Sequence, residues 1–213
     1  MTSRTLSIIC IAGIAVGASG CSAVAPPPVA PPPAEPTSTA AVYDGSSFAI
    51  PFRAEIAPEY LEPEVFGNRE LLWVSESTED QVVRFVAPME YFPWGETTAT
   101  PGLPDDYVAY LETLVPLGAT FEDVGTIDID GHDAAIMTVT TTQNLNGTLG
   151  CWNAKATPDE DCFGFQAALD MRFLALDLGD EVLIAWARAE KGSSGEQELF
   201  DGFEKMMGTI DLL

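Results

Sequence analysis

Apolar and polar residues alternate in short runs along most of the chain, and turn residues separate the runs. This period of two predicts β-strands, first at residues 46–56. Three pairs of neighbouring runs predict β-hairpins: 71–77 with 81–89, 120–130 with 132–142, and 168–178 with 181–190. Asp130-Gly131 joins the second pair, and this dipeptide favours a tight turn. A last strand is expected at 209–213.

Other stretches have the period of a helix. Residues 103–118 place Tyr107, Tyr110, Leu111 and Leu114 in one apolar stripe. Asp105 or Asp106 is suited to begin this helix, and Pro116 to end it. Residues 195–208 predict a second amphipathic helix, and 58–66 a short helical piece. Because hairpins dominate, we predict an α+β fold in which helices pack against a largely antiparallel sheet.

The first twenty residues differ in pattern from the rest. One basic residue, Arg4, precedes an apolar run from Leu6 to Ala18, which is typical of a secretory signal and short for a membrane span. Small residues then precede Cys21, and this resembles the lipobox of bacterial lipoproteins. The resemblance implies that Cys21 carries a diacylglycerol and becomes the N-terminus after cleavage. Ala18 departs from the lipobox pattern, because leucine or another large aliphatic residue is usual three places before the cysteine.

An alternative is simple secretion after cleavage behind Ala25, since 23–25 also fits the small-x-small rule. The residues after Cys21 are rich in Pro, Ala, Ser and Thr, and such a segment favours extended polyproline geometry. We therefore predict a signal peptide at 1–20, a lipidated and disordered proline-rich linker at 21–42, and one globular domain at 43–213.

Charge excludes some partners. The chain has 33 acidic residues, 9 lysines and arginines, and a formal net charge of −24. Such a surface repels nucleic-acid phosphates, so we expect no nucleic-acid binding. The predicted attachment to the membrane is the lipid, at the outer face of the cell membrane. An acidic surface also keeps an exported protein soluble.

The four cysteines support an address outside the cytoplasm. Cys10 lies in the signal and Cys21 in the lipobox, which leaves Cys151 and Cys162 at the ends of a polar segment. Outside the cytoplasm these two are expected to form a disulfide. Two cysteines and one histidine, without a C-x-x-C pair, do not make a zinc site, and we predict no metal and no cofactor.

Residues 127–140, the paired runs at 174–189 and the terminal helix and strand at 199–213 resemble the PsbP-like α-β-α sandwich domains. They are also similar to LpqN-type lipoproteins of Gram-positive envelopes. The resemblance implies a sandwich fold and a partner-binding or accessory role. It supplies no catalytic residues to carry over.

Candidate binding residues are the aromatics expected in loops: Tyr91, Phe92, Trp94 and Trp152. They could line a binding face, or cover sheet edges and pack on the disulfide. His132, the single histidine, is expected in a solvated hairpin turn, and we assign no catalytic residue. The preferred hypothesis is a non-catalytic binding or accessory module for an exported protein or a cell-wall component. The alternatives are a carboxylate-dependent envelope glycan hydrolase and a small-ligand carrier.

Overall fold

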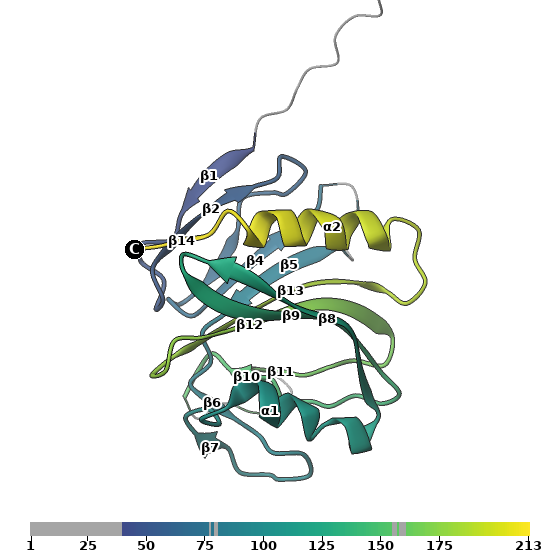
Figure 1. Ribbon diagram of the computed structural model, residues 1–213. Helices are drawn as coiled ribbons and strands as arrows, with labels where there is room; N and C mark the ends of the chain where they lie inside the picture. The colour runs from purple at the N-terminus through teal and green to yellow at the C-terminus, as the bar shows by residue number, and fades with distance from the viewer. Residues whose placement is uncertain (1–39, 77, 79–80, 155–156, 158–160) are drawn as a thin grey trace, which may run out of the picture. The chain divides into compact units, whose positions relative to one another are not determined.

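The computed structural model describes residues 40–76, 78, 81–154, 157 and 161–213 (Figure 1). The predicted signal, Cys21 and almost all of the linker lie outside the described residues.

A seven-stranded antiparallel sheet forms the centre, in the order β3-β4-β5-β13-β12-β9-β8. Its strands are β3 (Glu64–Phe66), β4 (Glu70–Val74), β5 (Val82–Val86), β8 (Ala119–Ile129), β9 (His132–Thr141), β12 (Leu169–Asp177) and β13 (Val182–Glu190). The three predicted hairpins, β4–β5, β8–β9 and β12–β13, all lie in this sheet.

Two smaller antiparallel sheets complete the described strands. One has the order β1-β2-β14 and consists of β1 (Ala41–Asp44), β2 (Phe52–Ile56) and β14 (Asp211–Leu212). The other has the order β11-β10-β6-β7 and consists of β6 (Glu90–Tyr91), β7 (Thr100–Pro101), β10 (Gly150–Cys151) and β11 (Cys162–Phe163). The helices are α1 (Tyr107–Glu112), α2 (Glu196–Met207) and the 3-10 turn η1 (Val115–Leu117).

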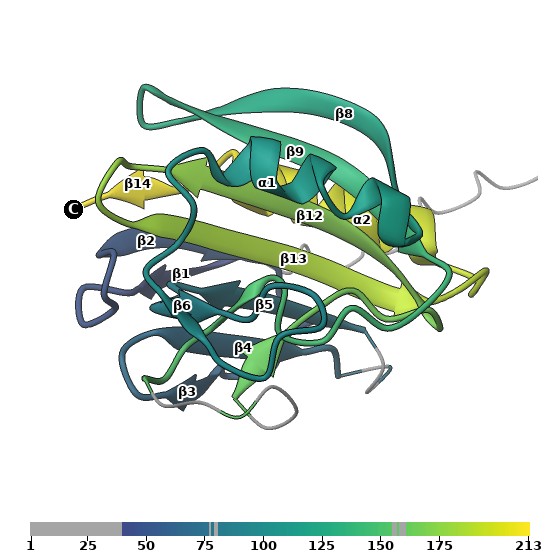
Figure 2. The same cartoon turned by 90° about the horizontal axis from the view of Figure 1, so that it is seen from below.

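Each face of the seven-stranded sheet has its own apolar core. Figure 1 shows α2 above the sheet and α1 below it, and Figure 2 shows α1 lying across β12. On the α2 face, Phe203 and Met207 pack with Leu174 and Phe85. On the α1 face, Tyr107 and Leu111 pack among residues that include Phe173. Alternation along each strand divides its side chains between the two cores.

Several local predictions are confirmed. Asp130 and Gly131 have φ values of 51° and 82°, the positive values that a tight hairpin turn requires. The side chain of Asp106 accepts a hydrogen bond from the backbone N–H of Ala109 and so caps α1. α2 lies where its apolar spacing predicts it, and buries Leu199, Phe203, Met206 and Met207 among others. The fold is α+β and largely antiparallel, as predicted.

Two predictions are wrong in detail. Residues 58–66 form no helix: Tyr60 pairs with Ser75 and β3 pairs with β4. Pro63 disfavours helical geometry at the residue before it, and backbone pairing with β4 provides the alternative. The helix expected at 103–118 is only six residues long, because the chain continues as the 3-10 turn η1, which contains Pro116.

Candidate functional site

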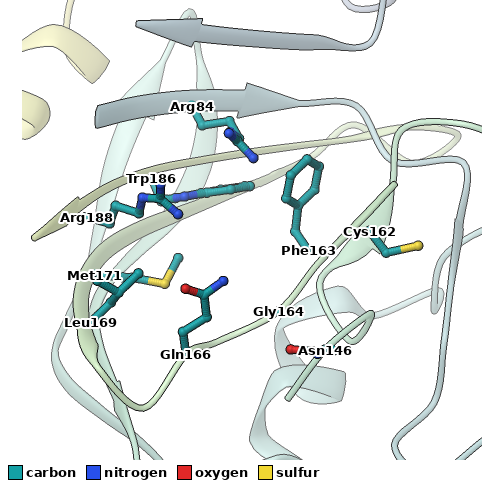
Figure 3. Close-up of a pocket in the computed structure, with 10 residues that line it drawn as sticks. All are labelled: Arg84, Asn146, Cys162, Phe163, Gly164, Gln166, Leu169, Met171, Trp186 and Arg188. Carbon is teal, nitrogen blue, oxygen red and sulfur yellow. The ribbon is translucent and has the colours of Figure 1, made fainter. Parts of the chain in front are cut away.

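The candidate site is a pocket of about 250 Å³ on the α1 face of the seven-stranded sheet (Figure 3). Its volume lies just below the usual range of about 300–1,000 Å³ for small-molecule sites, so it fits a ligand of few atoms. Four strands (β5, β11, β12 and β13), the segment after β11 and Asn146 before β10 supply its walls. The lining residues are Arg84, Asn146, Cys162, Phe163, Gly164, Gln166, Leu169, Met171, Trp186 and Arg188.

Strand register explains why the strand residues of the pocket meet. Trp186 of β13 lies directly opposite Arg84 of β5. Arg188, two residues farther along β13, lies opposite Met171 of β12. Because side chains alternate between the two faces of a sheet, these four point to the same side, the side that α1 covers. Two guanidinium groups, an indole and a thioether are thereby placed together.

The opposite wall depends on the predicted disulfide and on a glycine. Cys151 and Cys162 are directly paired across β10 and β11, and they form the disulfide. Phe163 follows immediately and lines the pocket. At Gly164 a Cβ atom would overlap the carbonyl oxygen of Leu145, so only glycine permits this close approach of two backbone segments. The wall is therefore fixed by one covalent bond and one tight crossing.

Arg84 has unusual surroundings for a cation. Its guanidinium carbon lies 4.8 Å from the ring centre of Phe163 and 5.9 Å from that of Trp186, which are cation–π distances. Its Nε lies 3.4 Å from a carboxylate oxygen of Glu70, but this buried nitrogen makes no hydrogen bond. Burial lowers the pKa of Arg84, and burial likewise raises the pKa of Glu70. Two aromatic faces and the ion pair with Glu70 compensate this charge.

The polar groups of the pocket suit binding better than proton transfer. Arg84 and Arg188 supply guanidinium donors, while Gln166 and Asn146 supply amides (Figure 3). Among the described residues that line the pocket there is no aspartate, glutamate or histidine. The arrangement can therefore bind an anion, and its described side chains include no carboxylate or imidazole to act as a general acid or base.

The four aromatics proposed from the sequence lie elsewhere. Tyr91 belongs to β6 and packs edge-to-face with Tyr110 at 5.0 Å, and Phe92 is buried. Trp94 is 43% exposed, and Trp152 is half-buried against the core of the α1 face. None of them is among the described residues that line the pocket. Their binding role stays a prediction, and only Phe92 is too buried to offer a surface.

Sequence reasoning missed Arg84, Trp186 and Arg188. The sequence did contain one sign of these residues. Each of the two arginines interrupts a nearly continuous apolar strand, in a chain that has few basic residues. Within the described ranges, no group of three or more histidines, cysteines, aspartates or glutamates is placed to hold a metal ion. No helix in those ranges is long and apolar enough to cross a bilayer.

No protein-family model and no curated protein matches this sequence. Among solved structures, the chain is similar to cyanobacterial PsbP from Synechocystis sp. PCC 6803, with 8% identity and a TM-score of 0.44. That alignment covers 82% of this chain and 93% of the other. A protein from Bacteroides thetaiotaomicron aligns with 11% identity, a TM-score of 0.42 and 82% coverage of this chain.

The chain spans only 48% of that Bacteroides protein. A PsbP protein is thus among the structural neighbours. At these identities the similarity concerns the fold alone.

Proposed function

We propose that this protein is an extracytoplasmic lipoprotein and a non-catalytic binding module that takes up a small ligand, or a small group of a partner, in the Arg84–Arg188 pocket. Its membrane attachment is the lipid on Cys21. Its partner is an exported protein or a cell-wall component that carries the group bound in the pocket.

One feature of the sequence and one of the structure support a location outside the cytoplasm. The lipobox-like residues before Cys21 follow an apolar signal of the right length. Two acyl chains are generally sufficient for stable attachment to a membrane. The disulfide between Cys151 and Cys162 belongs to an oxidising compartment.

The pocket supports binding over glycan hydrolysis. A carboxylate-dependent hydrolase needs two acids that flank the substrate, and the described residues of this pocket provide none. What they provide is a concentration of positive charge in a protein of net charge −24. This contrast is the observation that carries the proposal, because clefts lined by one sign of charge focus the field and attract counter-ions.

The anchor is tested by mass spectrometry of the N-terminal residue of the native protein. The expected result is a diacylated Cys21 and membrane association that Cys21→Ser abolishes. An unacylated terminus that starts behind Ala25 would replace the lipid anchor with simple secretion.

The binding role is tested by native mass spectrometry after incubation with a low-molecular-weight extract of the envelope. Gln166 is exposed at the pocket, so Gln166→Trp fills the pocket without disturbing the core. The matched control is Gln197→Trp, at an exposed position of α2. We expect a ligand adduct on the wild-type protein that is absent from Gln166→Trp and present on Gln197→Trp. An adduct unaffected by Gln166→Trp, or none at all, would contradict it.

A further inference from the structure

The further inference rests on this proposed binding function and concerns the chemical class of the ligand. We propose that the pocket recognises a carboxylate joined to a small flat apolar body. The guanidinium groups of Arg84 and Arg188 bind the carboxylate oxygens. The partly exposed ring of Phe163 and the side chain of Leu169 contact the body, and the amide of Gln166 adds a hydrogen bond.

The ion pairs of the other arginines show what is unusual about Arg84. Arg69 and Arg172 donate to the carboxylates of Glu181 and Glu204 at 2.9 and 2.7 Å. Arg53, on the other side of the molecule, donates to Asp44 at 3.4 Å in an exposed pair. Arg84 is mostly buried, yet its Nε makes no hydrogen bond, and Glu70 stays 3.4 Å away. A guanidinium that is mostly buried and makes no hydrogen bond at Nε is incompletely compensated, and an anion in the pocket adds a further opposite charge beside it.

Arg188 makes the pocket specific for an anion. It adds a second guanidinium to a pocket in which the described lining residues include no acid. Guanidinium groups bind the two oxygens of a carboxylate through parallel N–H donors, which fixes the orientation of the ligand. In Figure 3, Arg84 lies above the indole of Trp186 and Arg188 lies beside it, so the basic groups share one end of the pocket.

The remaining walls define the rest of the ligand. Phe163 presents a partly exposed ring and Leu169 partly exposed apolar surface, whereas Trp186 and Met171 are each 3% exposed and lie beneath them as a floor. An aromatic wall favours a flat body by stacking. A volume of about 250 Å³ limits that body to about one ring.

Charge favours a carboxylate over a phosphate. Outside the positive field of the pocket, the net charge of −24 opposes the approach of an anion. An ionised phosphate ester carries −1.5 to −2, roughly double the charge of a carboxylate, and is repelled correspondingly more. A carboxylate on a flat body occurs both in free aromatic acids and at the end of a peptide whose last residue is aromatic, and these two sources share the chemistry proposed here.

The experiment measures probe binding to the purified full-length protein by ligand-observed NMR. The probes are benzoate, neutral benzamide of the same shape, acetate without the ring, phenyl phosphate, and acetyl-phenylalanine as a mimic of a peptide end. We expect saturable binding of benzoate and at least ten-fold weaker binding of benzamide, acetate and phenyl phosphate. Acetyl-phenylalanine binding tighter than benzoate assigns the peptide source, and the reverse order assigns free acids.

Variants locate the binding. Arg188→Gln is expected to weaken benzoate binding at least ten-fold, and Gln166→Trp to abolish it. Arg53→Gln removes the same charge from β2, in the β1-β2-β14 sheet, which supplies none of the described residues that line the pocket. This control is expected to change binding less than two-fold. An unchanged melting temperature of each variant excludes misfolding.

Equal binding of benzamide and benzoate would overturn the carboxylate, as would tighter binding of phenyl phosphate or no saturable binding of any probe. In all three cases the envelope-extract experiment with Gln166→Trp still decides the binding role independently. Equal effects of Arg188→Gln and Arg53→Gln would overturn the assignment to this pocket.

Discussion

The two faces of the seven-stranded sheet are built in different ways. The α2 face is covered by a twelve-residue helix and the β1-β2-β14 sheet, and its core is aliphatic and aromatic. The α1 face is covered by a six-residue helix, strands of two residues and long connections. Hollows of about 390 and 380 Å³ also border α2, so the α1 face differs in being built from short elements and loops and not in being hollowed. The proposed binding pocket lies on the irregular face.

The irregular face is stabilised by specific bonds where apolar packing is less regular. The hydroxyl groups of Tyr107 and Tyr110 donate to the carbonyl oxygens of Leu149 and Thr148, at 2.8 and 2.9 Å. These bonds fasten the segment before β10 to α1. The disulfide then fastens β10 to β11. On the α2 face, the ion pair in which Arg172 donates to Glu204 connects β12 to α2 in a similar way.

The largest expected effects come from removing one buried ring on each face. Phe203 of α2 is fully buried, and Phe165, beside the pocket, is 1% exposed. Phe203→Ala and Phe165→Ala are each expected to lower the free energy of unfolding by about 3–5 kcal/mol in denaturant titrations. Only Phe165→Ala is expected to weaken benzoate binding as well. Equal loss of binding in both variants would contradict the separation of the two faces.

Removing the disulfide tests what holds the irregular face. The bridge closes a segment with a sequence separation of 11, so Cys151→Ser with Cys162→Ser is expected to cost about 3 kcal/mol of unfolding free energy. Benzoate binding is expected to weaken too, because Phe163 follows Cys162. The wild-type protein under reducing conditions serves as the control and should match the double variant. A smaller loss than about 1 kcal/mol would show that packing alone fixes this wall.

Alkaline pH tests the hydrogen bond from Tyr107 to Leu149 on the α1 face. Burial raises the pKa of Tyr107 well above its ordinary value of 10, so the folded protein holds this proton more tightly than the unfolded chain does. Its contribution to stability is therefore complete below pH 10 and is lost as the pH rises further. Above about pH 10 the free energy of unfolding should fall about 1.4 kcal/mol per pH unit more steeply in the wild type than in Tyr107→Phe. Parallel curves for the two proteins would contradict this.

The smallest expected effect concerns two glycines, one on each face. At Gly202, in the interior of α2, an added Cβ would meet no atom within 4 Å. Gly202→Ala should therefore raise the free energy of unfolding by about 0.5–1 kcal/mol, the helix preference for alanine. At Gly164 the same change overlaps the carbonyl of Leu145 and should be destabilising. Thermal melts of the two variants should shift in opposite directions.

The sequence predicted the regular face better than the irregular one. Long alternating strands such as β8 and β9, and the apolar stripe of α2, carry their periodicity within a single segment. β10 and β11 have two residues each, which is too short for any period to be visible. The helical pattern at 58–66 was outweighed by the pairing of Glu64–Phe66 with β4, a contact that no local pattern contains.

The candidate site was inaccessible to sequence reasoning for a related reason. Arg84, Phe163, Met171 and Trp186 lie in four separate segments and meet through strand register and a backbone crossing at Gly164. The disulfide was predictable, because cysteine count and compartment constrain it. Aromatic residues in loops drew attention to Tyr91, Phe92, Trp94 and Trp152, while the arginines that distinguish the pocket were hidden within apolar strands.

The small sheet β1-β2-β14 has a consequence for the order of assembly. β2 pairs on one edge with Ala41–Asp44 and on the other with Asp211–Leu212. One edge of β2 therefore stays unpaired, and open to any other strand, until Asp211–Leu212 reach it. A chain cut shortly before Asp211 would keep this open edge although the rest of its strands can pair, and an open edge favours aggregation.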